Sequence, residues 1–162
     1  MCGDALIAHL DLGEWQVASG FKRILCPIAF DENAIEALVL AVQLARQNDA
    51  TVILLYVVPF VMPPSYAPSN VYTSDVQQES ARKRLQEVAQ RYLKGIKCEL
   101  STHVGDVATT ILRAAQEFAA DVIVMATHGR HGVSRTLLGS VAQEIVRQSS
   151  CPVLSIRPFE SG

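Results

Sequence analysis

Residues 122–140 carry the sequence VIVMATHGRHGVSRTLLGS, in which a short apolar run leads into a segment with three glycines. The run from Asp121 to Met125 is typical of a buried strand, and Ser140 begins a stretch of helical period that extends to Gln148. The junction between a buried parallel strand and the next helix is where open α/β sheets bind ligands. Gly129 and Gly139 would allow close approach of the backbone, and the helix N-terminus would offer unpaired N–H groups to phosphate.

Two interpretations of this junction stay open. Arg130 and Arg135 add positive charge, and an arginine can hold phosphate oxygens through two parallel hydrogen bonds, which favours an anion site. Alternatively, Ser140 and Gln143 match the S-x-x-Q capping box, and the glycines only shape a connection. The stretch contains neither a Gly-Lys-Ser/Thr sequence nor G-x-G-x-x-G, which excludes the two common nucleotide-binding loops.

Outward from this stretch, short apolar runs rich in branched residues alternate with segments of helical period, which predicts an α/β fold with a parallel sheet. Strands are predicted at residues 23–29, 51–58, 97–104, 121–125 and 153–156. Asp31 is predicted to cap a helix that ends near Asn48, and its buried face is predicted to contain Ile35, Leu38, Val39, Val42 and Ala45. Further helices are predicted at about 75–94, around 111–119 and at 140–148. We interpret residues 1–20 as an N-terminal extension and residues 21–162 as one domain.

Composition and charge exclude several classes of protein. The 162 residues include 14 Lys and Arg against 16 Asp and Glu, a net charge of −2 without the basic excess that nucleic-acid binding needs. No apolar run approaches the roughly 18 to 20 residues that span a bilayer. No Lys or Arg precedes Lys22, unlike a signal peptide, and the four cysteines form no C-x-x-C pair. We therefore expect a cytoplasmic protein that binds neither nucleic acid nor membrane.

No motif in the sequence indicates a catalytic residue. His128 and His131 could offer two imidazoles, but no third ligand is visible, so we predict no metal site. Ser134 and Ser140 lack the G-x-S-x-G elbow that exposes a nucleophile, and Cys26 lies inside a predicted strand.

At this point the chain resembles the universal stress protein family, whose signature is G-x2-G-x9-G-[ST]. Ala126, Gly129, Gly139 and Ser140 reproduce the spacing, with alanine in the first position. The resemblance extends over residues 22–157 and includes the first strand leading to Pro27. It implies an open five-stranded parallel sheet of order 3-2-1-4-5 with helices on both faces, a Rossmann-like fold, and a homodimer paired through the last strand.

One branch of the family binds ATP, with or without magnesium, and its site can be carried over by position. The resemblance implies contacts to the adenine from Pro27, Ile28 and Val57, and contacts to the ribose and phosphates from Met125, Ala126 and Gly129. It further implies donors from the helix N-terminus at Gly139, Ser140 and Val141, with His128 and Arg130 nearby.

One departure from the family pattern weakens this expectation. Ala29 stands where ATP-binding relatives usually have an aspartate, and a methyl group cannot accept a hydrogen bond. A ligand donor left unpaired there costs about 1–3 kcal/mol, or roughly 5- to 150-fold in affinity. Asp31 is interpreted as the helix cap rather than as a substitute. We therefore expect a dimeric stress-response module that binds ATP or another adenine nucleotide weakly. The alternatives are a nucleotide-independent protein-interaction module, using the dimer surface or the proline-rich residues 62–70, and a slow ATP hydrolase.

Overall fold

The computed structural model of the chain describes residues 20–60, 74–127 and 139–156. In these residues strands and helices alternate, with bounds β1 Arg23–Pro27, α1 Glu32–Asn48, β2 Thr51–Pro59, α2 Ser74–Tyr92, β3 Lys97–Gly105, α3 Val107–Glu117, β4 Val122–Ala126, α4 Ser140–Gln148 and β5 Val153–Ile156. Each predicted strand is present, with ends that lie within two residues of the prediction. The α/β class is therefore confirmed.

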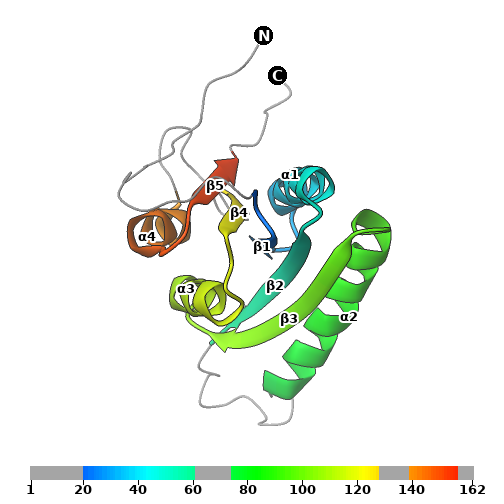
Figure 1. Cartoon of the computed structure of the whole chain (residues 1–162). Helices are drawn as coiled ribbons and strands as arrows, with labels where there is room; N and C mark the ends of the chain where they lie inside the picture. Colours follow the sequence, from blue (N-terminus) through cyan, green and yellow to red (C-terminus); the bar gives the residue numbers. More distant parts are fainter. Residues whose placement is uncertain (1–19, 61–73, 128–138, 157–162) are drawn as a thin grey trace, which may run out of the picture.

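The strands form one parallel sheet in the order β3-β2-β1-β4-β5, as the resemblance implied. Helices α1 and α2 lie on one face and α3 and α4 on the other, so the fold is the expected Rossmann-like arrangement (Figure 1). The chain builds outward from β1 through β2 to β3 and then crosses to the other side of β1 for β4 and β5. The direction of building thus reverses between β1 and β4.

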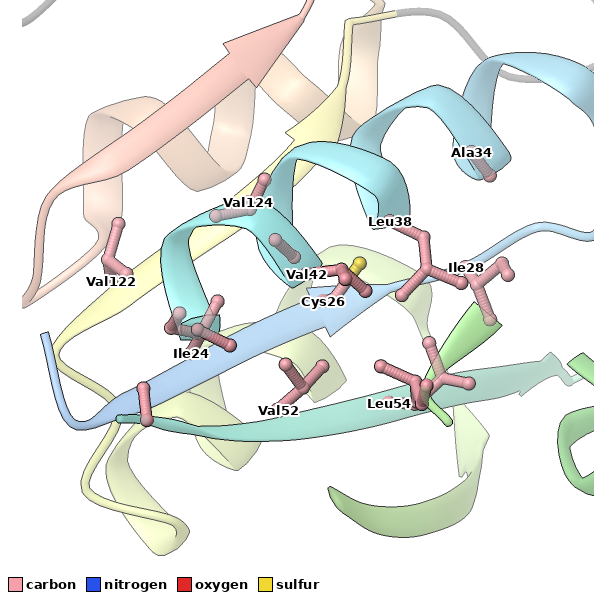
Figure 2. Close-up of a cluster of buried hydrophobic side chains, with 14 of the residues drawn as sticks. Ile24, Cys26, Ile28, Ala34, Leu38, Val42, Val52, Leu54, Val122 and Val124 are labelled. Carbon is pink, nitrogen blue, oxygen red and sulfur yellow. The ribbon is translucent and has the colours of Figure 1, made fainter. Parts of the chain in front are cut away.

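The core consists of two apolar layers, one on each face of the sheet, because the inner strands are apolar on both faces. Figure 2 shows the layer beneath α1, where side chains of β1, β2 and β4 meet those of the helix. Its labelled members are Ile24, Cys26, Ile28, Ala34, Leu38, Val42, Val52, Leu54, Val122 and Val124. The edge strand β3 differs, since its first four residues are exposed.

The buried face of helix α1 agrees with the prediction except at Val39 and at three alanines. Val39 is 42% exposed, so the prediction that it belongs to the inner face is wrong. Leu38, Val42 and Ala45 are buried as predicted, and three further alanines at 34, 37 and 41 complete the buried stripe. Val39 is turned by 100° from Leu38, out of the stripe, and the small alanines let the helix lie close to the sheet. Among the described residues, no helix is both long and apolar enough to cross a membrane.

Candidate functional site

The strands β1 and β4 separate at Pro27, and the candidate site lies at this separation. The Ile28 N–H donates to the Leu55 carbonyl of β2 at 2.9 Å. Because a parallel strand bonds alternately to its two neighbours, the backbone of Pro27 faces β4. Proline has no N–H, and the pairing with β4 accordingly ends at Leu25 and Ile123. The strand therefore stops at Pro27, two residues before the predicted end.

A cavity of about 550 Å³ lies at this separation, at the carboxyl end of the sheet. We call it the β1–β4 cavity. Its lining residues come from six elements and the turns beside them. They are residues 27–29 and 31 at the end of β1 and in the turn after it, 34 of α1, 55–57 and 59 of β2, 107 and 111 of α3, 125–127 at the end of β4, and 139–142 at the start of α4. The volume lies within the range of small-molecule sites, and the place is where open α/β sheets bind ligands.

The cavity brings together eight of the eleven residues that the resemblance assigned to a nucleotide. They are Pro27, Ile28, Val57, Met125, Ala126, Gly139, Ser140 and Val141. The other three, His128, Gly129 and Arg130, lie outside the described residues. Contact of any of these residues with a ligand stays a prediction, because the shared lining establishes proximity alone.

One part of the cavity is apolar. Ile28 directly follows β1 and packs in the layer on the α1 face of the sheet, whereas Val57 of β2 and Met125 of β4 pack in the layer on the α3 face, and each of the three is at most 6% exposed. Val107 and Ile111 of α3 complete this part. Apolar side chains at van der Waals distance suit a flat, weakly polar group such as an aromatic base, since its faces lose water without losing hydrogen bonds.

The N-terminus of α4 forms a second, polar part. Gly139 is the N-cap and provides no side-chain cap, and Gln143 is the first residue to bond within the helix, to the Gly139 carbonyl at 2.8 Å. The N–H groups of Ser140, Val141 and Ala142 therefore have no acceptor inside the helix. All three residues line the cavity, at the positive end of the helix dipole.

This geometry shows that the capping-box interpretation is wrong. Ser140 is already the first helical residue, one position too late for its side chain to cap. Backbone donors at an uncapped helix N-terminus are the usual means of holding phosphate. The α4 end of the cavity is thus suited to an anion.

Thr127 holds the start of α4 against the sheet. Its carbonyl accepts from the Gly139 N–H at 2.9 Å, and its own N–H donates to the Ile156 carbonyl at 2.9 Å. Thr127 is not among the site residues predicted from the sequence. Its position directly after β4 was the available signal, because residues after parallel strands meet at one edge of the sheet.

The α3 residues Val107 and Ile111 were also missed as site residues. The sequence predicts a strand at 97–104 and a helix around 111–119, but no lining residue from either. Since β3 is parallel to its neighbours, the helix that follows it must begin at the same edge of the sheet. That topological argument would have found both residues.

The turn between β1 and α1 presents a carboxylate. Phe30 has a φ of 57°, and the side chain of Asp31 accepts from the Ala34 N–H at 2.8 Å, which confirms the predicted helix cap. Ala29 is exposed, whereas Asp31 is partly buried, and both line the cavity. Among the described lining residues, Asp31 is the only one whose side chain carries a charge.

Neither of the two buried cysteines of the described residues lines the cavity. Burial raises the pKa of the Cys26 thiol to about 12, so at neutral pH it stays protonated and weakly nucleophilic. Burial likewise raises the pKa of Cys151. In the described part of the chain, no group of three His, Cys, Asp or Glu residues is arranged to hold a metal ion.

Comparisons with known proteins show which family this chain resembles. Residues 20–157 match the universal stress protein family. The universal stress protein MJ0531 of Methanocaldococcus jannaschii is 32% identical over 142 residues, which cover 85% of this chain and 82% of the relative. The structure of UspA from Lactobacillus plantarum shares the fold with a TM-score of 0.75 at 24% identity, covering 85% of this chain and 99% of that one.

Two further structures of the same fold have nucleotides bound. One is a universal stress protein in complex with cAMP, with a TM-score of 0.66 at 23% identity, covering 85% of this chain and 98% of that one. The other is a family protein from Arabidopsis thaliana with AMP bound, with a TM-score of 0.59 at 16% identity, covering 85% and 92%. The family match extends over most of this chain and agrees with its sheet order and its Ala126–Ser140 signature. The chain belongs to the universal stress protein family.

Proposed function

We propose that this protein is a stress-response module that binds an adenine nucleotide in the β1–β4 cavity and does not use it as a substrate. One observation carries the proposal: an apolar cavity between β1 and β4 ends at the uncapped N-terminus of α4. The first part suits a base and the second suits phosphate. The cAMP and AMP found in two proteins of this fold support the choice of adenine.

The base would lie among Ile28, Val57 and Pro27, and the phosphates would approach Ser140 and Val141. ATP is the expected ligand from the family branch described above, and magnesium would enter with its phosphates. A nucleotide with one phosphate is sufficient for both parts of the cavity. Affinity is expected to be weak, because the aspartate expected at position 29 is replaced by the methyl group of Ala29.

Isothermal titration of the purified protein with AMP, cAMP, ATP and ATP with magnesium tests the proposal. We expect saturable binding with a Kd below about 1 mM, equivalent to about −4 kcal/mol. Absence of binding for all four nucleotides would contradict the proposal and favour the nucleotide-independent interaction module.

A pair of charge variants locates the phosphate. Ser140→Glu places a carboxylate beside the free N–H groups and should lower affinity at least about tenfold by repulsion and competition. Gln143→Glu adds the same charge to an exposed residue of the same helix that does not line the cavity. Equal effects of the two substitutions would show that the phosphate does not lie at this helix end.

We also propose that the protein forms a homodimer through β5, which is an edge strand of the sheet. The Pro152 and Ile156 carbonyls accept from Ile123 and Thr127, so by alternation the backbone of Ser155 faces away from β4. Ser155→Pro removes that outward N–H, and an edge strand tolerates proline there. Light scattering after gel filtration should report a dimer for the unsubstituted protein and for Ser155→Ala, and a monomer for Ser155→Pro. A dimer in all three would place the interface elsewhere.

We infer the cytoplasm as the location. The cysteines in the described residues, Cys26, Cys98 and Cys151, are all free, which agrees with a reducing compartment. Fractionation of cells that express the tagged protein tests this inference, and recovery outside the cytoplasm would contradict it.

A further inference from the structure

The carboxylate of Asp31 uses one oxygen for the fold and leaves the other without a partner. Oδ1 accepts from the Ala34 N–H at 2.8 Å and caps α1. Oδ2 is buried and has no hydrogen-bond partner in the described part of the chain. A buried, unpaired carboxylate oxygen is destabilising, and native proteins rarely keep one without a reason in function. The same residue lines the β1–β4 cavity, so the reason can be sought in a ligand.

The local backbone fixes this carboxylate in place. Phe30 adopts a φ of 57°, and its ring centroid lies 4.6 Å from that of Tyr56. The Arg84 guanidinium lies 4.1 Å above the same ring. Bulky residues rarely adopt this conformation, which persists only where surrounding contacts hold it. The stack with Tyr56 and Arg84 supplies those contacts, and the turn then leads from the exposed Ala29 to the partly buried Asp31.

We propose that Asp31 Oδ2 accepts a hydrogen bond from the bound nucleotide and is a specificity-determining group of the site. This inference rests on the proposed function and adds a residue to it. The group that Asp31 recognises is a neutral N–H or O–H donor, because an anionic oxygen would be repelled. A nucleotide offers such a donor as the exocyclic amine of adenine or as a sugar hydroxyl. The phosphates belong at the other part of the cavity, beside the N–H groups of α4.

The substitution Asp31→Asn separates the two oxygens. The amide carbonyl can keep the bond to the Ala34 N–H, since asparagine caps helices as well as aspartate. The amide NH2 then stands where Oδ2 was, so a donor replaces an acceptor. We expect the affinity for AMP to fall about 10- to 100-fold, the effect of losing a hydrogen bond to a charged group.

Asp106→Asn is the matched control. Asp106 caps α3 in the same way, accepting from the Thr109 N–H at 2.9 Å, and it does not line the cavity. This variant loses the same charge at the same kind of helix position. It should bind AMP as tightly as the unsubstituted protein does. Thermal unfolding of both variants without ligand shows whether they are folded before titration.

Titration with three further nucleotides identifies the donor. Inosine monophosphate replaces the exocyclic amine by a carbonyl, and the 2′-deoxy and 3′-deoxy forms of AMP each lack one hydroxyl. If the amine is the donor, Asp31→Asn should reverse the preference for AMP over inosine monophosphate. If a hydroxyl is the donor, the corresponding deoxy form should bind both proteins equally. Either pattern supports the proposal.

Two results would overturn the inference. One leaves the proposed function intact, and the other contradicts it as well. Equal AMP affinity for the unsubstituted protein, Asp31→Asn and Asp106→Asn would show that Oδ2 contacts no ligand, while the proposed function would stand. Failure of the unsubstituted protein to bind any of the nucleotides would overturn the proposed function and this inference together.

Discussion

Phe30 and Asp31 show how a single backbone conformation sets the chemistry of the cavity. The left-handed φ of Phe30 follows directly after the exposed Ala29, and Asp31 then caps α1 while lining the cavity. The sequence supports the prediction of the cap, because aspartate before a helical period is a strong signal. The left-handed turn could not be predicted, because phenylalanine is a poor candidate for that conformation and tertiary contacts, among them those with Tyr56 and Arg84, hold it.

Gly105, which ends β3, should not tolerate a side chain. Its φ is 154°, and a Cβ there would lie 2.9 Å from Thr110 Oγ1. We expect Gly105→Ala to lower the free energy of unfolding by about 1–3 kcal/mol, measured by urea denaturation. Gly95→Ala is the control, because Gly95 also has a positive φ, 79°, but has open space around it. A loss for Gly105→Ala no larger than that for Gly95→Ala would contradict the role of the contact.

The helices differ in how their N-termini are capped, and the difference matches whether the N-terminus stabilises the fold or lines the cavity. Aspartate side chains cap α1 and α3, whereas the N-cap of α4 is Gly139, which provides no side-chain cap. Capped N–H groups stabilise the fold, and uncapped ones stay available to a ligand. Of these three, α4 is the helix whose first three residues all line the cavity.

The cap of α3 should make stability depend on acid pH. The Thr109 backbone N–H, first, and the Thr109 side chain hold the pKa of Asp106 below its ordinary value of 3.8. The ionised form is therefore favoured in the folded state, so its contribution is present above about pH 4 and is lost as pH falls through the lowered pKa. Asp106→Asn cannot titrate. We expect its unfolding free energy, measured by denaturant at pH 7, 4 and 3, to fall less on acidification than that of the unsubstituted protein. Parallel curves would contradict this.

The bounds of β1, β2, β4 and β5 followed from the sequence because each of these strands is a compact apolar run. One prediction and one of the two interpretations of the junction before α4 failed where the outcome depended on a shift of one residue. Ser140 and Gln143 satisfy the capping-box pattern, yet the helix begins at Ser140 itself. Val39 follows the buried Leu38 but points to solvent, because the close approach of α1 is set by alanines that carry little hydrophobic signal. The hydrophobic pattern alone does not fix, to within one residue, where a helix begins or which of its residues face the core.

At the scale of the whole molecule, the site results from the order in which the sheet is built. The chain reverses direction between β1 and β4, and Pro27 ends the hydrogen-bonded ladder there. Composition and periodicity predicted parallel strands, but the order came from the family resemblance, since equal apolar runs do not specify which strands are neighbours. The cavity consequently takes residues from elements far apart in the sequence and from both faces of the sheet.

A nucleotide in this cavity should therefore stabilise the entire domain. The lining includes residues of β1, β2, β4, α1, α3 and α4, and the two apolar layers share the inner strands, so unfolding of either layer removes the site. With AMP at about one hundred times its Kd, linkage raises the free energy of unfolding by about 2.7 kcal/mol. For a domain of this size the Tm should rise by about 5–10 °C in a single transition, measured by scanning calorimetry. Ser140→Glu should show the same Tm without ligand and little rise with AMP. A rise of the same size in that variant would mean that AMP stabilises the protein from a different site.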